Sequence, residues 1–400
     1  MEQPKVSFVI PCYKLAHLLR ECVGSILLQT YPNFEILIMD DCSPDNTSEV
    51  VASLSDERVR YVRNESNLGH LRNYNKGIQL ARGKYVWLIS ADDYLRRPYV
   101  LKRYVEMMER NPQMSFVFCP AVGVRRGQET NTLGYSIYSD HDRIVDGHKL
   151  LRSLLRQNFV VAASAMARRK CYDDAGYFPL ETTMQWSGDW YLWCVFSLQH
   201  SVGYLSEPMV CYREHELSMT SQLIEPGRIA TCSSGDIAVP WMVRDKALKL
   251  GCSDVADVCL KAAARQYERQ GGFIEYRSAR DKYSTWHLNE TEFESSLSNY
   301  AASEKIKDFM RSRYYLGVAD GLYHQGKLSD AKHHYLLAIG KRPWMARACL
   351  KLLVLFCGRI GQRLRNALHI IVSGEFVQRW YRMRENVVID ACEGSDNAQR

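Results

Sequence analysis

The sequence YVWLISADD, from Tyr85 to Asp93, decides the fold class. Its apolar part has the length of a buried β-strand, and it ends abruptly in two carboxylates, Asp92 and Asp93. Open α/β sheets bind ligands at the carboxyl ends of their strands, so these side chains stand where a ligand would lie. Carboxylate oxygens there suit Mg²⁺ or Mn²⁺ bound together with a substrate's phosphates. A solvated turn after an ordinary strand explains the same residues, because Asp is common in turns.

Strand-like and helix-like segments alternate on both sides of this stretch. The predicted strands cover residues 6–10, 35–39, 59–62, 85–90 and 116–119, and the clearest helices cover 18–27, 73–81 and 98–110. This alternation predicts an α/β fold class with a mainly parallel sheet and helices on both faces. Tyr13, Asp41 and the Asp92–Asp93 pair follow three of the strands, so we expect them along one edge of the sheet. No Gly-x-Gly-x-x-Gly follows the first strand, which argues against a dinucleotide-binding domain.

The composition describes an ordinary globular protein. A chain of 400 residues with 46% hydrophobic residues has room for two or three domains. Thirteen cysteines without any Cys-x-x-Cys pair argue against a disulfide framework and a zinc site, and predict reduced thiols in the cytosol. The net charge of +7 accompanies no recognition motif, so nucleic acid is not an expected partner. We find neither a signal peptide nor an apolar run of roughly 18 residues that would span a membrane.

Short motifs follow one another in a fixed order through the first half of the chain. They are VSFVIPCY (Val6–Tyr13), QTYPNFE (Gln29–Glu35), DDCSPDNT (Asp40–Thr47), NLG (Asn67–Gly69), RN (Arg72–Asn73), Gly77, ARGKY (Ala81–Tyr85) and the acidic pair at 92–93. The series resembles the family-2 glycosyltransferases of the GT-A fold over about residues 4–220. Enzymes of this family transfer a sugar from a nucleotide diphosphate donor, usually with inversion at the anomeric carbon.

The resemblance implies a nucleotide site at the sheet edge. Pro11 and Tyr13 would border the base, and Asp41 would hydrogen-bond it, most often as uracil. Arg72 would approach the nucleotide from the loop that Asn67 and Gly69 open. Asp92 would contact the ribose or share the metal.

The resemblance also implies a metal ion and a general base. Asp93 would ligate Mg²⁺ or Mn²⁺, and His215 in the closing motif CYREH (Cys211–His215) would complete the metal or diphosphate site. A satisfied surface or core histidine explains His215 as well. Asp189, in the motif SGDWYLW (Ser187–Trp193), matches the general base.

Four positions depart from the commonest pattern of the family. Lys14 stands where Asn is usual, and Cys42 where Gly is usual. Ser90 stands at the first position of the family's Asp-any-Asp motif, where Asp is frequent. Metal binding therefore depends on Asp92 and Asp93, which follow it. Gly188 replaces a frequent Glu, while the residue that matches the base is kept.

Inverting transfer is a single displacement, in which the acceptor hydroxyl loses its proton as the new bond forms. A carboxylate within about 3 Å of that hydroxyl can take the proton, and Asp189 is our hypothesis for this base. Its place at a helix start predicts that the helix dipole stabilises the charged form, which weakens it as a base. A helix cap is the alternative explanation for Asp189.

The acceptor side is less sharply defined by the sequence. Residues 127–142 are polar without periodicity and are predicted to form a loop. The arginines at 168–169 match positions that lie near the acceptor in the family, although ordinary surface charges explain them equally. Trp186 precedes the predicted helix and fits stacking on a sugar ring.

The second half of the chain has a helical pattern. We therefore predict a GT-A domain over 1–225 and an all-helical domain over 226–385. Residues 312–343 resemble one tetratricopeptide-type hairpin, and a plain helical pair is the alternative. Residues 341–384 hold ten Lys or Arg against one Glu, which fits peripheral contact with anionic lipid or a solvated helix. Residues 386–400 are expected to be a disordered tail.

Together these features predict a metal-dependent inverting glycosyltransferase. Its donor would be a nucleotide diphosphate sugar, most often of uridine, and its acceptor a saccharide or a lipid-linked saccharide. We expect it in the cytoplasm, either free or peripheral at the inner face of the membrane, with a role in polysaccharide synthesis. A nucleotidyltransferase with a related acidic metal site and a non-catalytic adaptor acting through its helical domain are the alternatives.

Overall fold

The computed structural model describes residues 4–216, 218, 221, 229–272, 274–276, 284–343 and 345–356. The chain divides into two compact units, residues 1–255 and 256–400. Helix α9 (Ile229–Lys249) therefore belongs to the first unit, beyond the residue 225 at which the sequence pattern changes.

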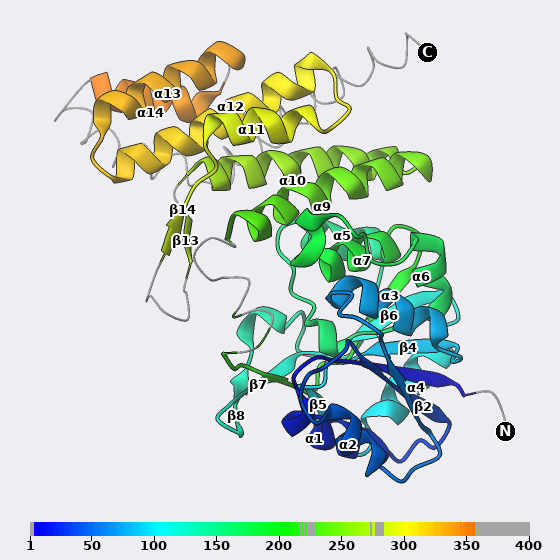
Figure 1. Ribbon diagram of the computed structural model, residues 1–400. Coiled ribbons are helices and arrows are strands. Elements are labelled where there is room, and N and C mark those ends of the chain that lie inside the picture. Colours follow the sequence, from blue (N-terminus) through cyan, green and yellow to red (C-terminus); the bar gives the residue numbers. More distant parts are fainter. Residues whose placement is uncertain are drawn as a thin grey trace. The chain divides into compact units, whose positions relative to one another are not determined.

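An eight-stranded mixed sheet forms the centre of the first unit (Figure 1). Its order is β3-β2-β1-β4-β10-β6-β11-β9. The strands are β1 (Val6–Cys12), β2 (Phe34–Asp40), β3 (Val59–Arg63), β4 (Tyr85–Leu88), β6 (Met114–Phe118), β9 (Arg143–Val145), β10 (Met166–Arg168) and β11 (Ser201–Tyr204). β3, β2, β1 and β4 run parallel, whereas β10 lies antiparallel between β4 and β6. The predicted α/β fold class is confirmed, with two antiparallel strands that the alternating pattern does not reveal.

Helices surround this sheet. They are α1 (Ala16–Leu27), α2 (Thr47–Ala52), α3 (His70–Leu80), α4 (Val100–Arg110), α5 (Gly147–Leu154), α6 (Arg169–Ala175), α7 (Gly188–Phe196) and the short 3₁₀ helices η1 (Gly134–Ser136), η2 (Ala162–Ser164) and η3 (Thr182–Gln185). Helix α3 lies against β1, β2 and β4, which places its first turns near the carboxyl ends of these strands.

A smaller sheet of order β5-β12-β7-β8 completes the first unit. Its strands are β5 (Tyr94–Leu95), β7 (Ala121–Arg125), β8 (Gln128–Thr132) and β12 (Val210–Arg213). β5 begins directly after Asp93 and pairs with β12, so the acidic pair and the closing motif are brought side by side. The expectation of a loop over 127–142 is wrong for β8, because this exposed edge strand pairs through its backbone and shows no apolar alternation.

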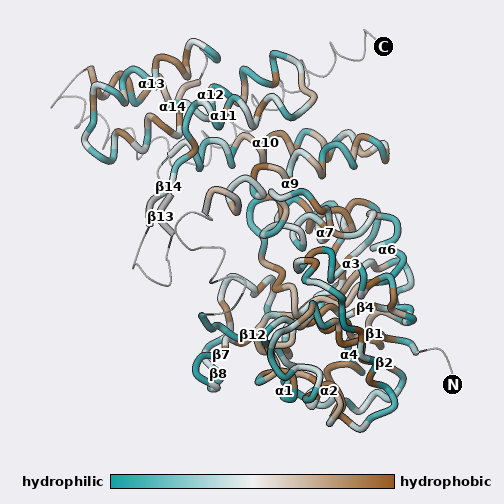
Figure 2. The backbone as a smooth tube through the Cα atoms, in the orientation of Figure 1, coloured by the Kyte–Doolittle hydropathy of each residue, from teal (hydrophilic) through white to brown (hydrophobic). Residues whose placement is uncertain are grey.

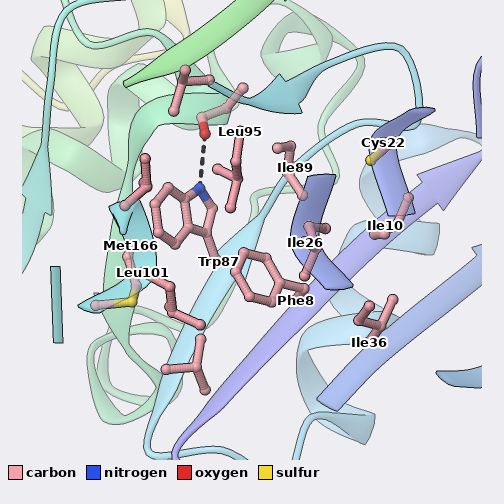
Figure 3. Packing of buried hydrophobic residues seen from close by; sticks show 14 of the residues in the cluster. Phe8, Ile10, Cys22, Ile26, Ile36, Trp87, Ile89, Leu95, Leu101 and Met166 are labelled. Atoms are coloured by element: carbon pink, nitrogen blue, oxygen red, sulfur yellow. Dashed lines mark hydrogen bonds between the residues drawn. The ribbon is translucent and has the colours of Figure 1, made fainter. Parts of the chain in front are cut away.

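Trp87 is the largest side chain in the centre of the main core (Figure 3). Its ring stacks on Phe8 with centroids 5.4 Å apart and on Tyr104 at 4.3 Å. Its indole N–H donates to the Ala163 carbonyl at 2.8 Å, which satisfies the one polar atom of the ring. Figure 2 shows the central strands as mainly hydrophobic, as expected for strands buried on both faces.

The second unit is helical. Its elements are α10 (Ser253–Gly271, which begins at the boundary), the hairpin β13 (Ile274–Tyr276) and β14 (Ser284–Trp286), α11 (Glu290–Ser298), α12 (Glu304–His324), α13 (Leu328–Lys341) and α14 (Ala346–Phe356). α12 and α13 pack along each other, and Gly326 at φ +78° lies between them. A helical pair is therefore present over 312–343, and its likeness to a tetratricopeptide hairpin stays a prediction.

Two expectations fall mostly or wholly on residues that the structure does not describe. Residues 357–384 of the basic segment and the tail 386–400 lie outside the described residues. Among the helices that are described, none has both the length and the apolar character needed to cross a bilayer.

Candidate active site

The ends of β1, β2 and β4 meet at one edge of the main sheet. These strands are parallel neighbours, so Tyr13, Asp41 and the acidic pair that follow them emerge on the same side. The Asp41 N–H donates to the Cys12 carbonyl at 3.0 Å, and the Ala91 N–H donates to the Pro11 carbonyl at 3.3 Å. The structure thus brings together the residues that the sequence assigns to nucleotide and metal.

Asp41 is buried and anchors a loop. One of its oxygens accepts from the Asn64 amide and the Leu68 N–H, both at 2.8 Å, and the other accepts from the Gly69 N–H at 3.0 Å. These bonds fix the loop that leads to Arg72, whose side chain is exposed at the start of α3. Asp41 therefore shapes this edge of the sheet through the loop, and its second oxygen has capacity for a further donor.

Two of the departures from the family pattern lie in strained backbone beside this edge. Lys14 has φ +59° and Cys42 has φ +60°, in the left-handed region that Asn and Gly adopt most easily. The residues usual at these positions, Asn and Gly, are thus those that the backbone shape favours. Tyr13, between Pro11 and Lys14, keeps 41% of its surface exposed, with the Lys14 ammonium 5.1 Å from its ring centroid.

The two adjacent carboxylates have different surroundings. Asp93 is 4% exposed and accepts from the backbone N–H of Arg213 at 2.9 Å. Asp92 Oδ2 lies 3.0 Å from His215 Nε2, while Asp92 Oδ1 is buried with no hydrogen-bond partner among the described residues. Burial, followed by the charge of Asp92, raises the pKa of Asp93 well above its usual value. A cation placed here would relieve both effects.

Arg213 links Asp92 and Asp93 to β12 and α1 through hydrogen bonds. The sequence did not single out Arg213 for this role. Its Nε donates to the Asp92 carbonyl at 3.0 Å, and its guanidinium reaches Glu21 on α1. Arg213 is the last residue of β12, and its guanidinium lies 5.5 Å from the Tyr94 ring centroid. The only indication of this role in the sequence is that Arg213 belongs to the motif that ends at His215.

Asp189 is the second residue of α7. Its Oδ1 accepts from the Trp190 N–H at 2.7 Å, and its Oδ2 lies 3.4 Å from the Asn158 amide nitrogen. Asp189 as a whole is partly exposed, whereas its carboxylate group is surrounded by protein. This burial of the carboxylate raises the pKa of Asp189 from 3.8 to about 6. The expectation that the helix dipole dominates is therefore wrong, because desolvation outweighs it. Asp189 also acts partly as a helix cap, because it accepts a hydrogen bond from the Trp190 N–H in the first turn of α7.

The charges of Asp93 and Asp189 both act on two tyrosines, Tyr74 and Tyr135, and the sequence reading named neither. Burial raises the pKa of the Tyr74 hydroxyl, and the charges of Asp92, Asp189 and Asp93 raise it further. Burial also raises the pKa of Tyr135 to about 12, with added contributions from Glu214 and from the same Asp189 and Asp93. Contacts join Asp189 to the sheet edge: a Cβ at Gly188 would lie 3.4 Å from Leu71 in the first turn of α3, and Asp41 anchors the loop before that helix, so these residues belong to one region.

The arginine pair at 168–169 is not part of this region. Arg168 ends β10 opposite Tyr85, at the amino end of β4 and hence at the far edge of the sheet. Its guanidinium donates to the carbonyls of Met114, Met108 and Asn111, so it has a structural role.

A divalent metal fits the acidic pair. Within the described part of the chain, no group of three or more His, Cys, Asp or Glu side chains is arranged to hold a metal ion. The unpartnered Asp92 Oδ1 and the carboxylate of Asp93 are hard oxygen donors of the type that Mg²⁺ and Mn²⁺ bind. Both ions commonly take remaining ligands from substrate phosphates and water.

Comparison with known proteins gives three findings. Residues 7–175 match the model of glycosyl transferase family 2. The chain is 35% identical over 108 residues to the glycosyltransferase GlyG of Streptococcus pneumoniae, an alignment covering 26% of this chain and 36% of GlyG. It is 34% identical over 116 residues to TuaG of Bacillus subtilis, a glycosyltransferase named for teichuronic acid biosynthesis, covering 28% and 46% of the two chains. The alignments thus span less than half of either relative.

A solved structure shares the fold. Residues 1–349 of TarS from S. aureus, crystallised with UDP-GlcNAc, superpose with a TM-score of 0.53 at 16% sequence identity. The match covers 88% of this chain and 89% of that chain.

Proposed function

Since the chain carries a family-2 glycosyltransferase domain of the GT-A fold, we propose that it is a metal-dependent inverting glycosyltransferase with Asp189 as its general base. The observation that carries the proposal is a chain of contacts from the sheet edge to Asp189: Asp41 anchors the loop that leads into α3, and a Cβ at Gly188, beside Asp189, would lie 3.4 Å from Leu71 in the first turn of α3. Asp92 and Asp93 would then face the donor phosphates, and Asp189, almost 100 residues further along the chain, would accept the proton.

Asp189 has the properties that a base needs. A pKa near 6 leaves it ionised at neutral pH while making it a better proton acceptor than an ordinary aspartate. In the proposed step, the acceptor hydroxyl gives its proton to Asp189 as its oxygen bonds to the anomeric carbon. The bond from that carbon to the diphosphate oxygen breaks at the same time, and the nucleoside diphosphate leaves with the electron pair. One displacement inverts the anomeric configuration.

The acidic pair would hold the metal. Asp93 and the free oxygen of Asp92 would be its ligands, with His215 either as a further ligand or as the partner that orients Asp92. When bound, the ion would offset the negative charge that grows on the diphosphate. Arg213 keeps both carboxylates in position through its contacts with the backbone and side chain of the pair.

A uridine diphosphate sugar is the donor that we propose. Asp41 retains an acceptor oxygen for the base, Tyr13 offers an exposed ring beside it, and Arg72 stands exposed in the loop that Asp41 anchors. The crystallisation of TarS with UDP-GlcNAc agrees with this choice of nucleotide.

The acceptor that we propose is a saccharide hydroxyl, free or lipid-linked, in the synthesis of a cell-surface polysaccharide. The name of the relative TuaG points to such a pathway. We place the reaction in the cytoplasm, with residues 341–384 as a segment that contacts the inner membrane face. Flotation with anionic liposomes at low salt would detect that contact, and a protein that stays with the unbound fraction would remove it.

The test is a screen of nucleotide sugars with and without Mn²⁺, in which the released nucleotide is identified. We expect nucleoside diphosphate and a glycoside of inverted configuration, both dependent on the metal. Release of pyrophosphate would favour the nucleotidyltransferase, and absence of turnover and of donor hydrolysis with every sugar would favour the adaptor.

A further inference from the structure

The backbone beside the proposed base is held by helix α9. The Ser187 hydroxyl, two residues before Asp189, donates to Asp236 Oδ1 at 3.0 Å, and Ser187 is only 2% exposed. A Cβ atom added at Gly235 would overlap the Thr183 carbonyl oxygen, so α9 lies directly against η3. These contacts fix the main chain that leads into α7. The freedom that remains for the carboxylate is rotation of the Asp189 side chain.

The two oxygens of the Asp189 carboxylate have different partners. Oδ1 accepts from the Trp190 N–H at 2.7 Å, within its own helix. Oδ2 lies 3.4 Å from the Asn158 amide nitrogen, which is a long hydrogen bond. A carboxylate oxygen can accept two hydrogen bonds, so Oδ2 has capacity for a second donor. Oδ2 is therefore the better placed of the two oxygens to receive the proton of an acceptor hydroxyl.

The side chain of Asn158 is itself fixed in one orientation. Its Oδ1 atom accepts from the Val160 N–H at 3.2 Å. Because a backbone N–H can only donate, the oxygen of the amide must face Val160, and the NH₂ group then faces Asp189. The loop that carries Asn158 continues into η2, whose Ala163 carbonyl accepts from the buried Trp87 indole at 2.8 Å. The NH₂ group is thus held at Asp189 by a loop that is anchored in the main core.

We propose that Asn158 is a positioning residue for the transfer reaction: its amide holds Asp189 Oδ2 toward the acceptor hydroxyl and keeps that oxygen unprotonated until transfer. An amide suits this role because it donates at every working pH and carries no charge of its own. In the displacement proposed above, the proton of the acceptor hydroxyl would pass to Oδ2, while Oδ1 would keep its bond to Trp190. The assignment rests on the proposed function and extends it to the control of the base.

Several groups influence the charge of Asp189. Burial is the largest influence and raises its pKa to about 6, with a smaller contribution in the same direction from Asp236 on α9, whereas the bonds from Trp190 and Asn158 lower it. The charge of Asp189 also acts on three tyrosine hydroxyls, which burial keeps protonated near neutral pH: Tyr74, Tyr135 and Tyr172. Removal of the Asn158 donor should raise the pKa of Asp189, because the charged form loses a hydrogen bond.

The test compares Asn158→Asp and Asn158→Ala with wild type. The Asp variant keeps an oxygen for the Val160 N–H but brings no donor to Asp189 at neutral pH, whereas Ala removes both contacts. Carbon NMR of protein labelled at the aspartate carboxyls follows the titration of Asp189, with Asp189→Asn identifying its signal. We expect its apparent pKa to rise by about 0.5 to 1 unit in Asn158→Ala, and by more in Asn158→Asp, where a second negative charge adjoins it.

The transfer rate should follow this titration. We expect the rise of kcat with pH to move to higher pH by the same amount in each variant. The plateau of kcat should fall about 10- to 100-fold as Oδ2 loses its orientation, while affinity for UDP stays at the wild-type value. Asn111→Asp is the matched control and should behave as wild type does. The Asn111 amide donates to the Met107 carbonyl at 2.8 Å in the turn before β6, at the amino end of that strand.

An unchanged titration of Asp189 in both variants would overturn the assignment. A loss of rate confined to Asn158→Ala would also overturn it, because support of the loop at Val160 would then explain the residue. If Asp189→Asn transferred sugar at the wild-type rate, the proposed function would fail, and the titration would still decide whether Asn158 holds this carboxylate in its charged form.

Discussion

The buried carboxylate of Asp93 accepts its hydrogen bond from the backbone N–H of Arg213, 120 residues further along the chain, at 2.9 Å. This one contact joins the end of β4 to the end of β12. Because the Arg213 side chain also holds the Asp92 carbonyl, both carboxylates of the pair depend on the same residue for their position.

Arg213→Gln should weaken metal and nucleotide binding and lower the free energy of unfolding by about 1 to 3 kcal/mol, because partly buried hydrogen bonds from the guanidinium to the Asp92 carbonyl and to Glu21 are lost. Calorimetric titration with Mn²⁺ and UDP, together with urea unfolding, measures both effects. Arg125→Gln is the control, since Arg125 pairs with Glu214 at the exposed surface and should change little. If both variants bound equally well, Arg213 would have no positioning role.

Gly188→Glu, which introduces the residue frequent in the family, should destabilise the protein by about 1 to 3 kcal/mol. Its Cβ would meet Phe178 at 3.0 Å and Leu71 at 3.4 Å, and both side chains are buried. Gly24→Ala in α1 serves as the contrast, because nothing lies within 4 Å of a Cβ there, and it should stabilise by about 0.5 to 1 kcal/mol. Thermal unfolding of the two variants would contradict the packing argument if Gly188→Glu were the more stable.

Asp189→Asn should raise stability at neutral pH. The folded pKa of about 6 exceeds the unfolded value of 3.8, so the native state holds more protons between these values and wild-type stability falls as pH rises through that window. Asn does not titrate, and above pH 6 the variant should gain about 1 to 3 kcal/mol over wild type, with little gain near pH 4. Unfolding curves at pH 4, 5, 6 and 7.5 measure the difference. A gain that is constant across this range would show that the carboxylate is not destabilised by burial.

Cys42→Gly should stabilise the protein by about 0.5 to 1 kcal/mol, because glycine removes the strain at φ +60° but loses more entropy on folding. Cys349→Gly is the matched control, since Cys349 is exposed within the helix α14 and its replacement should cost about 0.3 kcal/mol, the difference in helix propensity between Cys and Gly. Opposite signs in thermal unfolding are the expected result. Two losses of equal size would contradict the strain at Cys42.

The sequence predicts those features that depend on local pattern. The apolar run before Asp92 and the alternation of strands and helices are sufficient to predict the sheet edge on which Asp41 and the acidic pair meet. The insertion of β10 between β4 and β6 is not predictable in this way, because a three-residue strand carries no period.

Long-range contacts explain what the sequence leaves out of the site. Arg213 acts through its backbone and guanidinium on residues 120 positions away, and Tyr74 packs on Phe178, which belongs to a loop far along the chain. The pKa of Asp189 is likewise set by its burial in the folded unit, whereas its position in α7 alone predicts the opposite shift.

The most direct test of the account is the transfer rate of Asp189→Asn with the donor that wild type uses, measured beside its affinity for UDP. We predict a fall in kcat of about 10²- to 10⁴-fold with UDP binding unchanged, and a wild-type rate that rises with pH through about 6. Near-wild-type turnover by Asp189→Asn would contradict the central claim that this carboxylate takes the acceptor's proton.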